Sequence, residues 1–145
     1  MIDLSGIKED SRKIGEKCGL FGIYGRKGLQ AARLTYFGLY TLQHRGQESS
    51  GISATDGISI KTHKRMGLVA QVYSEEDLDL LQGNMAIGHN RYATSGGSFH
   101  EHTQPYTDSD YLVALAHNGN LPKVEKLTSF LKSKNVETNH LNDSG

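Results

Sequence analysis

The first clear pattern along the chain is an alternation of apolar side chains and glycines over residues 18–24, Cys-Gly-Leu-Phe-Gly-Ile-Tyr. This period of two predicts a buried strand, and Gly25 and Gly28 permit a turn after it. From residue 29 to residue 43, apolar side chains recur at steps of three and four, which predicts a helix that packs one face on a sheet. The residues expected on that face are Ala32, Tyr36, Phe37, Leu39 and Tyr40.

The dipeptide Asp56-Gly57 marks the clearest hairpin. It separates residues 51–55 from residues 58–61, two runs of strand-forming side chains. Asp-Gly readily adopts the positive φ angles of a two-residue turn. We therefore expect two antiparallel strands joined by a tight turn.

The remaining elements are shorter and follow in alternation. Ser74 precedes the acidic residues 75–77, which predicts the capped start of a short helix. Residues 85–88 and 111–116 are expected to be buried strands, and residues 122–134 a second amphipathic helix. Helices combined with hairpin-type strands predict a layered α+β domain with helix over antiparallel sheet. The chain ends soon after the last helix, so we expect the domain to be incomplete at its C-terminus.

Composition and charge narrow the classes of function. Lysine plus arginine number 16, as do aspartate plus glutamate, so no net field favours nucleic acid or an anionic membrane. The longest apolar runs, such as residues 111–116, are far shorter than the roughly 20 residues that span a bilayer. Residues 1–17 are charged and lack the apolar stretch of a secretory signal, which predicts a leader on a soluble, cytoplasmic protein. The single cysteine, Cys18, excludes an internal disulfide and a cluster of several thiolates.

Glycine is dense around four polar clusters, each of which lies at the start or the end of a predicted strand or helix. Polar side chains beside glycine at the ends of elements bring backbone amides and reactive groups close to a ligand. Any one cluster is more simply explained as a turn, but four together favour a site. The clusters are residues 18–19, 44–51, 88–97 and 116–120.

Three of these segments resemble the signature segments of class II, N-terminal-nucleophile glutamine amidotransferases. They are residues 42–52 (LQHRGQESSGI), 88–94 (GHNRYAT) and 115–121 (LAHNGNL). Within that class they are similar to the amidophosphoribosyltransferase family, and the resemblance runs from about Lys17 to the end of the chain. Glucosamine-6-phosphate synthases typically have tyrosine in place of His44 and tryptophan in place of Tyr92. The resemblance implies a four-layer α/β/β/α N-terminal-nucleophile (Ntn) hydrolase fold.

The resemblance also implies that Cys18 is the nucleophile. The family requires the cysteine at the amino terminus of the mature chain, where its own α-amino group, with a pKa near 8, can act as general base. Residues 1–17 would therefore be a propeptide cleaved between Lys17 and Cys18, and residues 18–145 part of the amidotransferase domain. For a lone cysteine the simpler reading is an inert buried thiol.

Asn118 and Gly119 are expected, by the same resemblance, to donate hydrogen bonds to the tetrahedral oxyanion. Fixed donors of this kind are worth about 3 to 4 kcal/mol of barrier each. Without the resemblance, Asn-Gly after a strand would be interpreted as a simple turn. A turn can present donors as well, so the two interpretations are compatible.

Four further residues are expected to hold the substrate glutamine. Arg91 can bind its α-carboxylate in bidentate fashion, although a surface salt bridge is the alternative. Tyr92 and Thr94 would line the same pocket. Asp143 stands where the family has an aspartate for the α-ammonium group, but the acidic residue that follows in the family is replaced by Gly145. A terminal charge without a role is the alternative for Asp143.

Other polar residues near these motifs have expected supporting roles. Arg45 and Gln47 are predicted to support the nucleophile strand, and His89 and His117 to be structural donors rather than the base. The His-Glu-His run at residues 100–102 resembles a metal pair, but no third ligand stands at a typical spacing, and we expect a solvated loop. No metal or cofactor is therefore expected in this chain.

The expected function is glutamine amide hydrolysis that supplies ammonia for phosphoribosylamine, the first committed step of purine synthesis. By resemblance, the partner is a phosphoribosyltransferase domain or subunit that binds phosphoribosyl pyrophosphate with magnesium, and the parent protein can be a homo-oligomer. Three alternatives stay open. They are a class II amidotransferase with another ammonia acceptor, a truncated fragment without activity, and a self-processing peptidase of the same fold.

Overall fold

The computed structural model of the chain describes residues 18–92, 100–119 and 125–136. The expected leader, residues 1–17, lies outside the described residues. None of the helices in the described ranges is long and apolar enough to cross a membrane.

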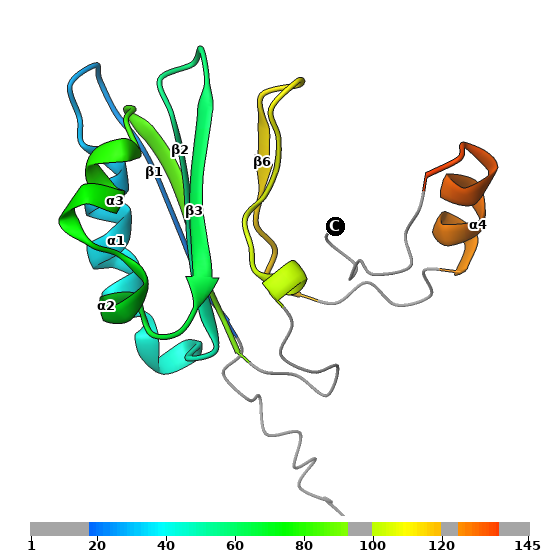
Figure 1. Cartoon of the computed structure of the whole chain (residues 1–145), viewed down its shortest axis with the longest axis horizontal. Coiled ribbons are helices and arrows are strands. Elements are labelled where there is room, and N and C mark those ends of the chain that lie inside the picture. The colour runs from blue at the N-terminus through cyan, green and yellow to red at the C-terminus, as the bar shows by residue number, and fades with distance from the viewer. Residues whose placement is uncertain (1–17, 93–99, 120–124, 137–145) are drawn as a thin grey trace, which may run out of the picture.

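A four-stranded antiparallel sheet forms the centre of the fold (Figure 1). Its strands run in the order β1 (Gly19–Tyr24), β4 (Met85–Arg91), β2 (Ser49–Thr55) and β3 (Ile60–Met66). The register pairs Gly19 with Asn90 and Ser49 with Arg91, so one end of the sheet collects the start of β1, the start of β2 and the end of β4. The polar motifs around residues 18, 44–51 and 88–91 therefore meet at this end. The predicted strands at residues 18–24 and 85–88 are confirmed, but β1 is not fully buried, since Leu20 is 47% and Tyr24 75% exposed.

Helices cover one face of this sheet (Figure 1). They are α1 (Ala31–Thr41), α2 (Val69–Val72) and α3 (Glu75–Leu80), with a short 3-10 helix, η1 (Gln43–Arg45), after α1. Ser74 caps α3 as predicted, because its hydroxyl accepts a hydrogen bond from the Asp77 backbone N–H at 3.1 Å. The core between helices and sheet consists of buried residues from both layers: Ala31, Ala32, Leu39, Ile52, Ala54, Val69, Val72, Tyr73, Leu78, Leu81 and Ala86.

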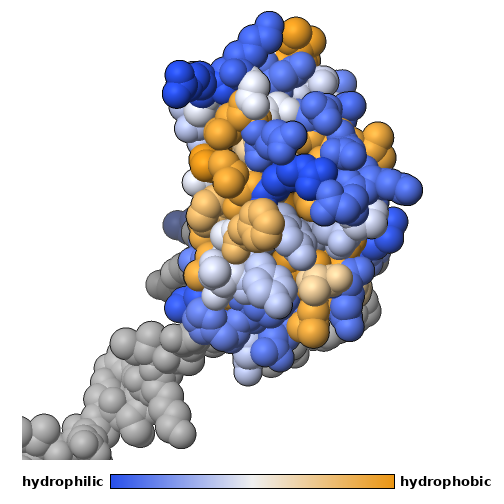
Figure 2. Space-filling model, turned by 90° about the vertical axis from the view of Figure 1, so that its left-hand side faces the viewer, coloured by the Kyte–Doolittle hydropathy of each residue, from blue (hydrophilic) through white to orange (hydrophobic). Residues whose placement is uncertain are grey.

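The buried face of α1 differs from the predicted one. Ala32 and Leu39 are buried as expected, but Phe37 is 63% exposed and Tyr40 is 56% exposed. The reason is the close approach of α1 to β4, where a side chain at Gly88 would come within 2.6 Å of Thr35. Thr35 and Leu39 make this contact, so the packed side of α1 is centred on them and the rings of Phe37 and Tyr40 lie outside it. The helix side is drawn in Figure 2, where hydrophobic side chains form separate patches among hydrophilic ones.

The predicted hairpin at Asp56-Gly57 is confirmed, but its turn is longer than two residues. Thr55 pairs with Ile60, so residues 56–59 form the loop between β2 and β3. Gly57 has the expected positive φ, 91°. The Asp56 carboxylate accepts hydrogen bonds from the backbone N–H groups of Ile58 (3.0 Å) and Ser59 (3.2 Å). These two contacts give the backbone donors of the longer loop an acceptor.

A second, two-stranded sheet lies on the side of the first sheet that faces away from the helices (Figure 1). It consists of β5 (Tyr106–Asp108) and β6 (Val113–Leu115), preceded by the 3-10 helix η2 (His100–His102). The predicted strand at residues 111–116 is thus present but shorter, and it is not buried, since Val113 is 52% exposed. The last helix, α4 (Glu125–Ser133), has no buried residue and lies apart from both sheets. The layered α+β class is confirmed.

Candidate active site

Cys18 stands immediately before β1, at the end of the sheet where the polar motifs meet. It is a free, half-buried cysteine with a positive φ of 58°. A non-glycine residue in the left-handed region costs roughly 1 kcal/mol, so other contacts must hold this conformation. The Cys18 carbonyl oxygen accepts hydrogen bonds from Nε of Arg45 (3.0 Å) and from Nδ2 of Asn118 (3.4 Å). The contact expected between Arg45 and the strand that follows Cys18 is therefore present.

Asn118 and Gly119 follow β6 and approach Cys18 from the second sheet. The Asn118–Cys18 hydrogen bond joins residues that are 100 positions apart in the chain. At Gly119 a side chain would overlap the ring of His117 in its present position, so a larger residue there would have to displace that ring. The predicted site residue Asn118 thus contacts Cys18, and Gly119 follows Asn118 directly in the chain.

Arg91 ends β4 and forms an ion pair with Glu48, from Nη1 to Oε1. The pair is buried, with side-chain exposures of 9% for Arg91 and 7% for Glu48. Arg91 therefore forms a buried ion pair, with a carboxylate from the segment just before β2, and not the surface salt bridge considered as the alternative. The backbone N–H of Glu48 also donates to the Arg91 carbonyl at 3.0 Å. Sequence reasoning missed Glu48, although it follows the Gln47 that was singled out.

Tyr92 and the two histidines lie near this end of the sheet. Tyr92 follows Arg91 and is 46% exposed, so its ring is accessible to a small ligand. His89 is buried, and burial, with a smaller contribution from the positive charge of Arg91, lowers its pKa to about 4. A neutral imidazole with so low a pKa is a weak base at neutral pH, as expected for a residue that is not the general base. The donor role expected for His89 stays a prediction, because neither ring nitrogen makes a hydrogen bond within the described residues.

The comparisons with known proteins identify the family. No family model matches the chain. The amidophosphoribosyltransferase of Synechococcus elongatus is 49% identical over 131 residues, which cover 89% of this chain and 26% of that protein. The enzyme of the same name from Bacillus subtilis is 44% identical over 124 residues, or 83% of this chain and 26% of its own length. The chain belongs to the amidophosphoribosyltransferase family.

Solved structures of amidophosphoribosyltransferases have the same fold. A glutamine phosphoribosylpyrophosphate amidotransferase from Bacillus subtilis, complexed with ADP and GMP, superimposes with a TM-score of 0.74 and 39% identity. A structure described as the allosteric regulatory enzyme of purine biosynthesis gives a TM-score of 0.77 and 42% identity. Each match covers 86% of this chain and 27% of the other chain. The Ntn fold expected from the motifs is thereby confirmed, and the chain spans about a quarter of the length of these amidophosphoribosyltransferases.

Two of the predicted substrate residues of the amidophosphoribosyltransferase motifs, Thr94 and Asp143, lie outside the described residues. The division into a leader (1–17) and a domain (18–145) stays a prediction, as does the role of each site residue. Among the described residues no group of three or more histidine, cysteine, aspartate or glutamate side chains is arranged to hold a metal ion.

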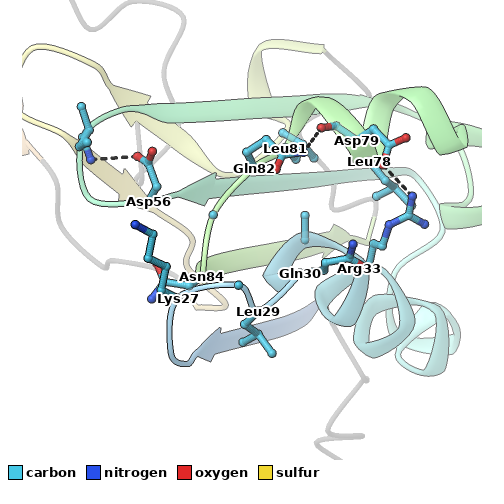
Figure 3. A pocket seen from close by; sticks show the side chains of 14 residues that line it. Lys27, Leu29, Gln30, Arg33, Asp56, Leu78, Asp79, Leu81, Gln82 and Asn84 are labelled. Atoms are coloured by element: carbon cyan, nitrogen blue, oxygen red, sulfur yellow. Dashed lines mark hydrogen bonds and ion pairs between the residues drawn. The ribbon is translucent and has the colours of Figure 1, made fainter.

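A pocket of about 540 Å³ lies at the opposite end of the sheet from Cys18, between the loop after β1, the β2–β3 loop and α3 (Figure 3). Its most prominent cation, Arg33, is paired with Glu75 (2.6 Å) and Asp79 (2.8 Å). Because the amidophosphoribosyltransferase motifs gather at the other end, this pocket is separate from the candidate active site.

Proposed function

We propose that the chain is a glutaminase domain, which hydrolyses the side-chain amide of glutamine and supplies ammonia. The observation that carries this proposal is the Asn118 side chain, which lies 3.4 Å from the carbonyl oxygen of Cys18. A cysteine thiol and a side-chain amide donor on the same residue's carbonyl, together with the N–H of Gly119 next in the chain, are the parts that acyl transfer requires. The family membership of the chain supports the same conclusion.

The proposed reaction begins when Cys18 becomes the first residue, which frees its α-amino group. That amine takes the thiol proton, and the thiolate attacks the amide carbon of glutamine. Asn118 Nδ2 carries two hydrogens, so one can remain on the Cys18 carbonyl while the other donates to the oxyanion with the N–H of Gly119. The ammonium form of the amine returns its proton to the leaving nitrogen, and ammonia departs. Water then hydrolyses the thioester to glutamate and regenerates the thiol.

Arg91 is the proposed anchor for the α-carboxylate of glutamine. Glu48 already contacts Nη1, so the substrate carboxylate would bind along another edge of the guanidinium group. The buried ion pair fixes the direction of this group before the substrate arrives. Tyr92, Thr94 and Asp143 stay proposed as further substrate contacts.

The proposed acceptor of the ammonia is phosphoribosyl pyrophosphate, because the relatives are named for transfer to that compound. Their length leaves room for an acceptor domain outside the matched quarter, and magnesium is expected only there. A homo-oligomeric parent protein and a cytoplasmic setting stay predictions. The alternatives are an amidotransferase with a different acceptor and a fragment that keeps the motifs without the activity.

Intact mass measurement of the purified chain tests the proposal directly. The sample is measured before and after reaction with 6-diazo-5-oxo-norleucine, a glutamine analogue, and a Cys18→Ala variant is the control. We expect loss of residues 1–17 and one adduct that depends on Cys18, together with release of ammonia from glutamine. A chain that stays unprocessed, takes no label and releases no ammonia would establish the inactive alternative.

A further inference from the structure

Gln104 connects the second sheet to the loop that carries the proposed oxyanion donors. Its side-chain Oε1 accepts a hydrogen bond from the backbone N–H of His117 at 2.6 Å. Gln104 is only 6% exposed, so this contact is shielded from water. His117 directly precedes Asn118 and Gly119, and the hydrogen bond therefore fixes the start of the segment that carries the two proposed donors.

The main chain of Gln104 is fixed on the four-stranded sheet. Its carbonyl oxygen lies against Gly51 of β2, so closely that any side chain at position 51 would overlap it. On either side of it, the carbonyls of Thr103 (2.7 Å) and Pro105 (3.1 Å) both accept hydrogen bonds from Nζ of Lys64 on β3. Two strands of the sheet thus determine where Gln104 stands.

Cys18 is attached to the same sheet through β1, whereas Asn118 follows the second sheet. The distance between the proposed nucleophile and the proposed donors consequently depends on the position in which the second sheet packs on the first. The main chain of Gln104 packs against the first sheet at Gly51. Its side chain accepts a hydrogen bond from His117, directly before the proposed donors. An error of about 1 Å in such a distance can cost on the order of 100-fold in rate.

We propose that Gln104 is a positioning residue that holds the Asn118–Gly119 donors at the correct distance from Cys18. The inference rests on the proposed function, because it assigns Gln104 to the oxyanion site of that reaction. Gln104 touches neither the nucleophile nor the substrate in this scheme, and it acts through the His117 N–H. Its effect should therefore appear in the transition state, where the oxyanion forms, and not in glutamine binding.

The test compares three variants of the full chain. Gln104→Met removes the acceptor at nearly the same volume, and Gln104→Glu keeps an oxygen at the same chain length. Asn84→Leu is the matched control, since its side-chain amide donates to the Gly25 carbonyl at the far end of β1. Hydrogen exchange of the His117, Asn118 and Gly119 amides is measured with kcat and KM for glutamine hydrolysis.

For Gln104→Met we expect faster exchange of the His117 amide and a kcat about 10- to 100-fold lower, with KM within about twofold of the original. Gln104→Glu should restore most of the kcat, and Asn84→Leu should leave the exchange of the three amides and kcat unchanged. An unchanged kcat in Gln104→Met, or an equal loss in both Gln104 variants and the control, would overturn the inference. An inactive parent chain would refute the proposed function instead, and unchanged amide exchange in Gln104→Met would then refute the positioning by Gln104.

Discussion

Removal of the Glu48 carboxylate is expected to destabilise the fold strongly. The side chains of Glu48 and Arg91 are 7% and 9% exposed, so Glu48→Leu would leave a guanidinium charge buried without its partner. Breaking a buried ion pair from one side costs about 3–5 kcal/mol. This is a large part of the roughly 5–15 kcal/mol by which a domain is stable.

Urea denaturation measures the effect. With an m-value of about 1.5 kcal/mol per molar urea, a loss of about 4 kcal/mol would lower the midpoint by about 2.7 M. The double variant Glu48→Leu with Arg91→Leu removes both charges, and such replacements are often neutral or stabilising. We therefore expect the double variant to be more stable than Glu48→Leu alone.

A double-mutant cycle separates the pair from the packing around it. The coupling between positions 48 and 91 should reach about 2–3 kcal/mol, because the two side chains are in contact and shielded from water. A single Glu48→Leu variant that loses less than about 1 kcal/mol would refute this reasoning. It would mean that the pair is solvated and behaves as an exposed salt bridge.

Three further predictions follow from the same end of the sheet. Asn118→Ala should lower kcat about 100- to 1,000-fold with little change in KM, as measured by ammonia release, because one oxyanion donor is lost. The pKa of His89 is about 4 in the folded chain, against an ordinary value of 6.5. As the pH falls, His89 is therefore protonated in the unfolded chain before it is protonated in the folded chain. Stability should decline between pH 6.5 and 4 by about 3 kcal/mol from this group, and urea midpoints of His89→Gln should lack that decline. Gly51→Ala should cost about 1–3 kcal/mol, because its methyl group would overlap the Gln104 carbonyl, whereas Gly22→Ala, with its nearest neighbour at 3.6 Å, should cost far less in the same assay.

Much of the fold could be predicted from local patterns because those patterns report local forces. The alternation in residues 18–24 and the Asp56-Gly57 turn depend on neighbouring residues, and both elements were found in the expected places. The exposure of Phe37 was not predictable in this way, because the side of α1 that packs is set by the contact of Thr35 and Leu39 with Gly88, which lies far away in the chain.

The residues of the candidate site likewise fall into those that the sequence could identify and those that only the folded structure shows. Cys18, Arg91 and the Asn118-Gly119 pair stand in recognisable segments, and the family resemblance selects them. Glu48 and Gln104 were missed, since the importance of each depends on a partner that only the folded chain brings near. For Gln104 no signal exists in the flanking residues, because its partner is a backbone N–H, which every residue except proline possesses.

The hydrogen bonds to the Cys18 carbonyl bear on how the proposed leader can be removed without loss of the site. Arg45 and Asn118 hold Cys18 on its C-terminal side, Arg45 from the 3-10 helix η1 and Asn118 from the segment after the second sheet. The proposed cleavage breaks the bond on the N-terminal side, between Lys17 and Cys18. The anchoring of the nucleophile therefore does not depend on the bond that is cut, and cleavage adds only the free amine that the reaction needs as its base. The positive φ of Cys18 belongs to the uncut chain alone, because this angle is defined by the carbonyl carbon of residue 17. The proposed cut therefore removes the cost of that conformation, while the two hydrogen bonds to the Cys18 carbonyl are kept.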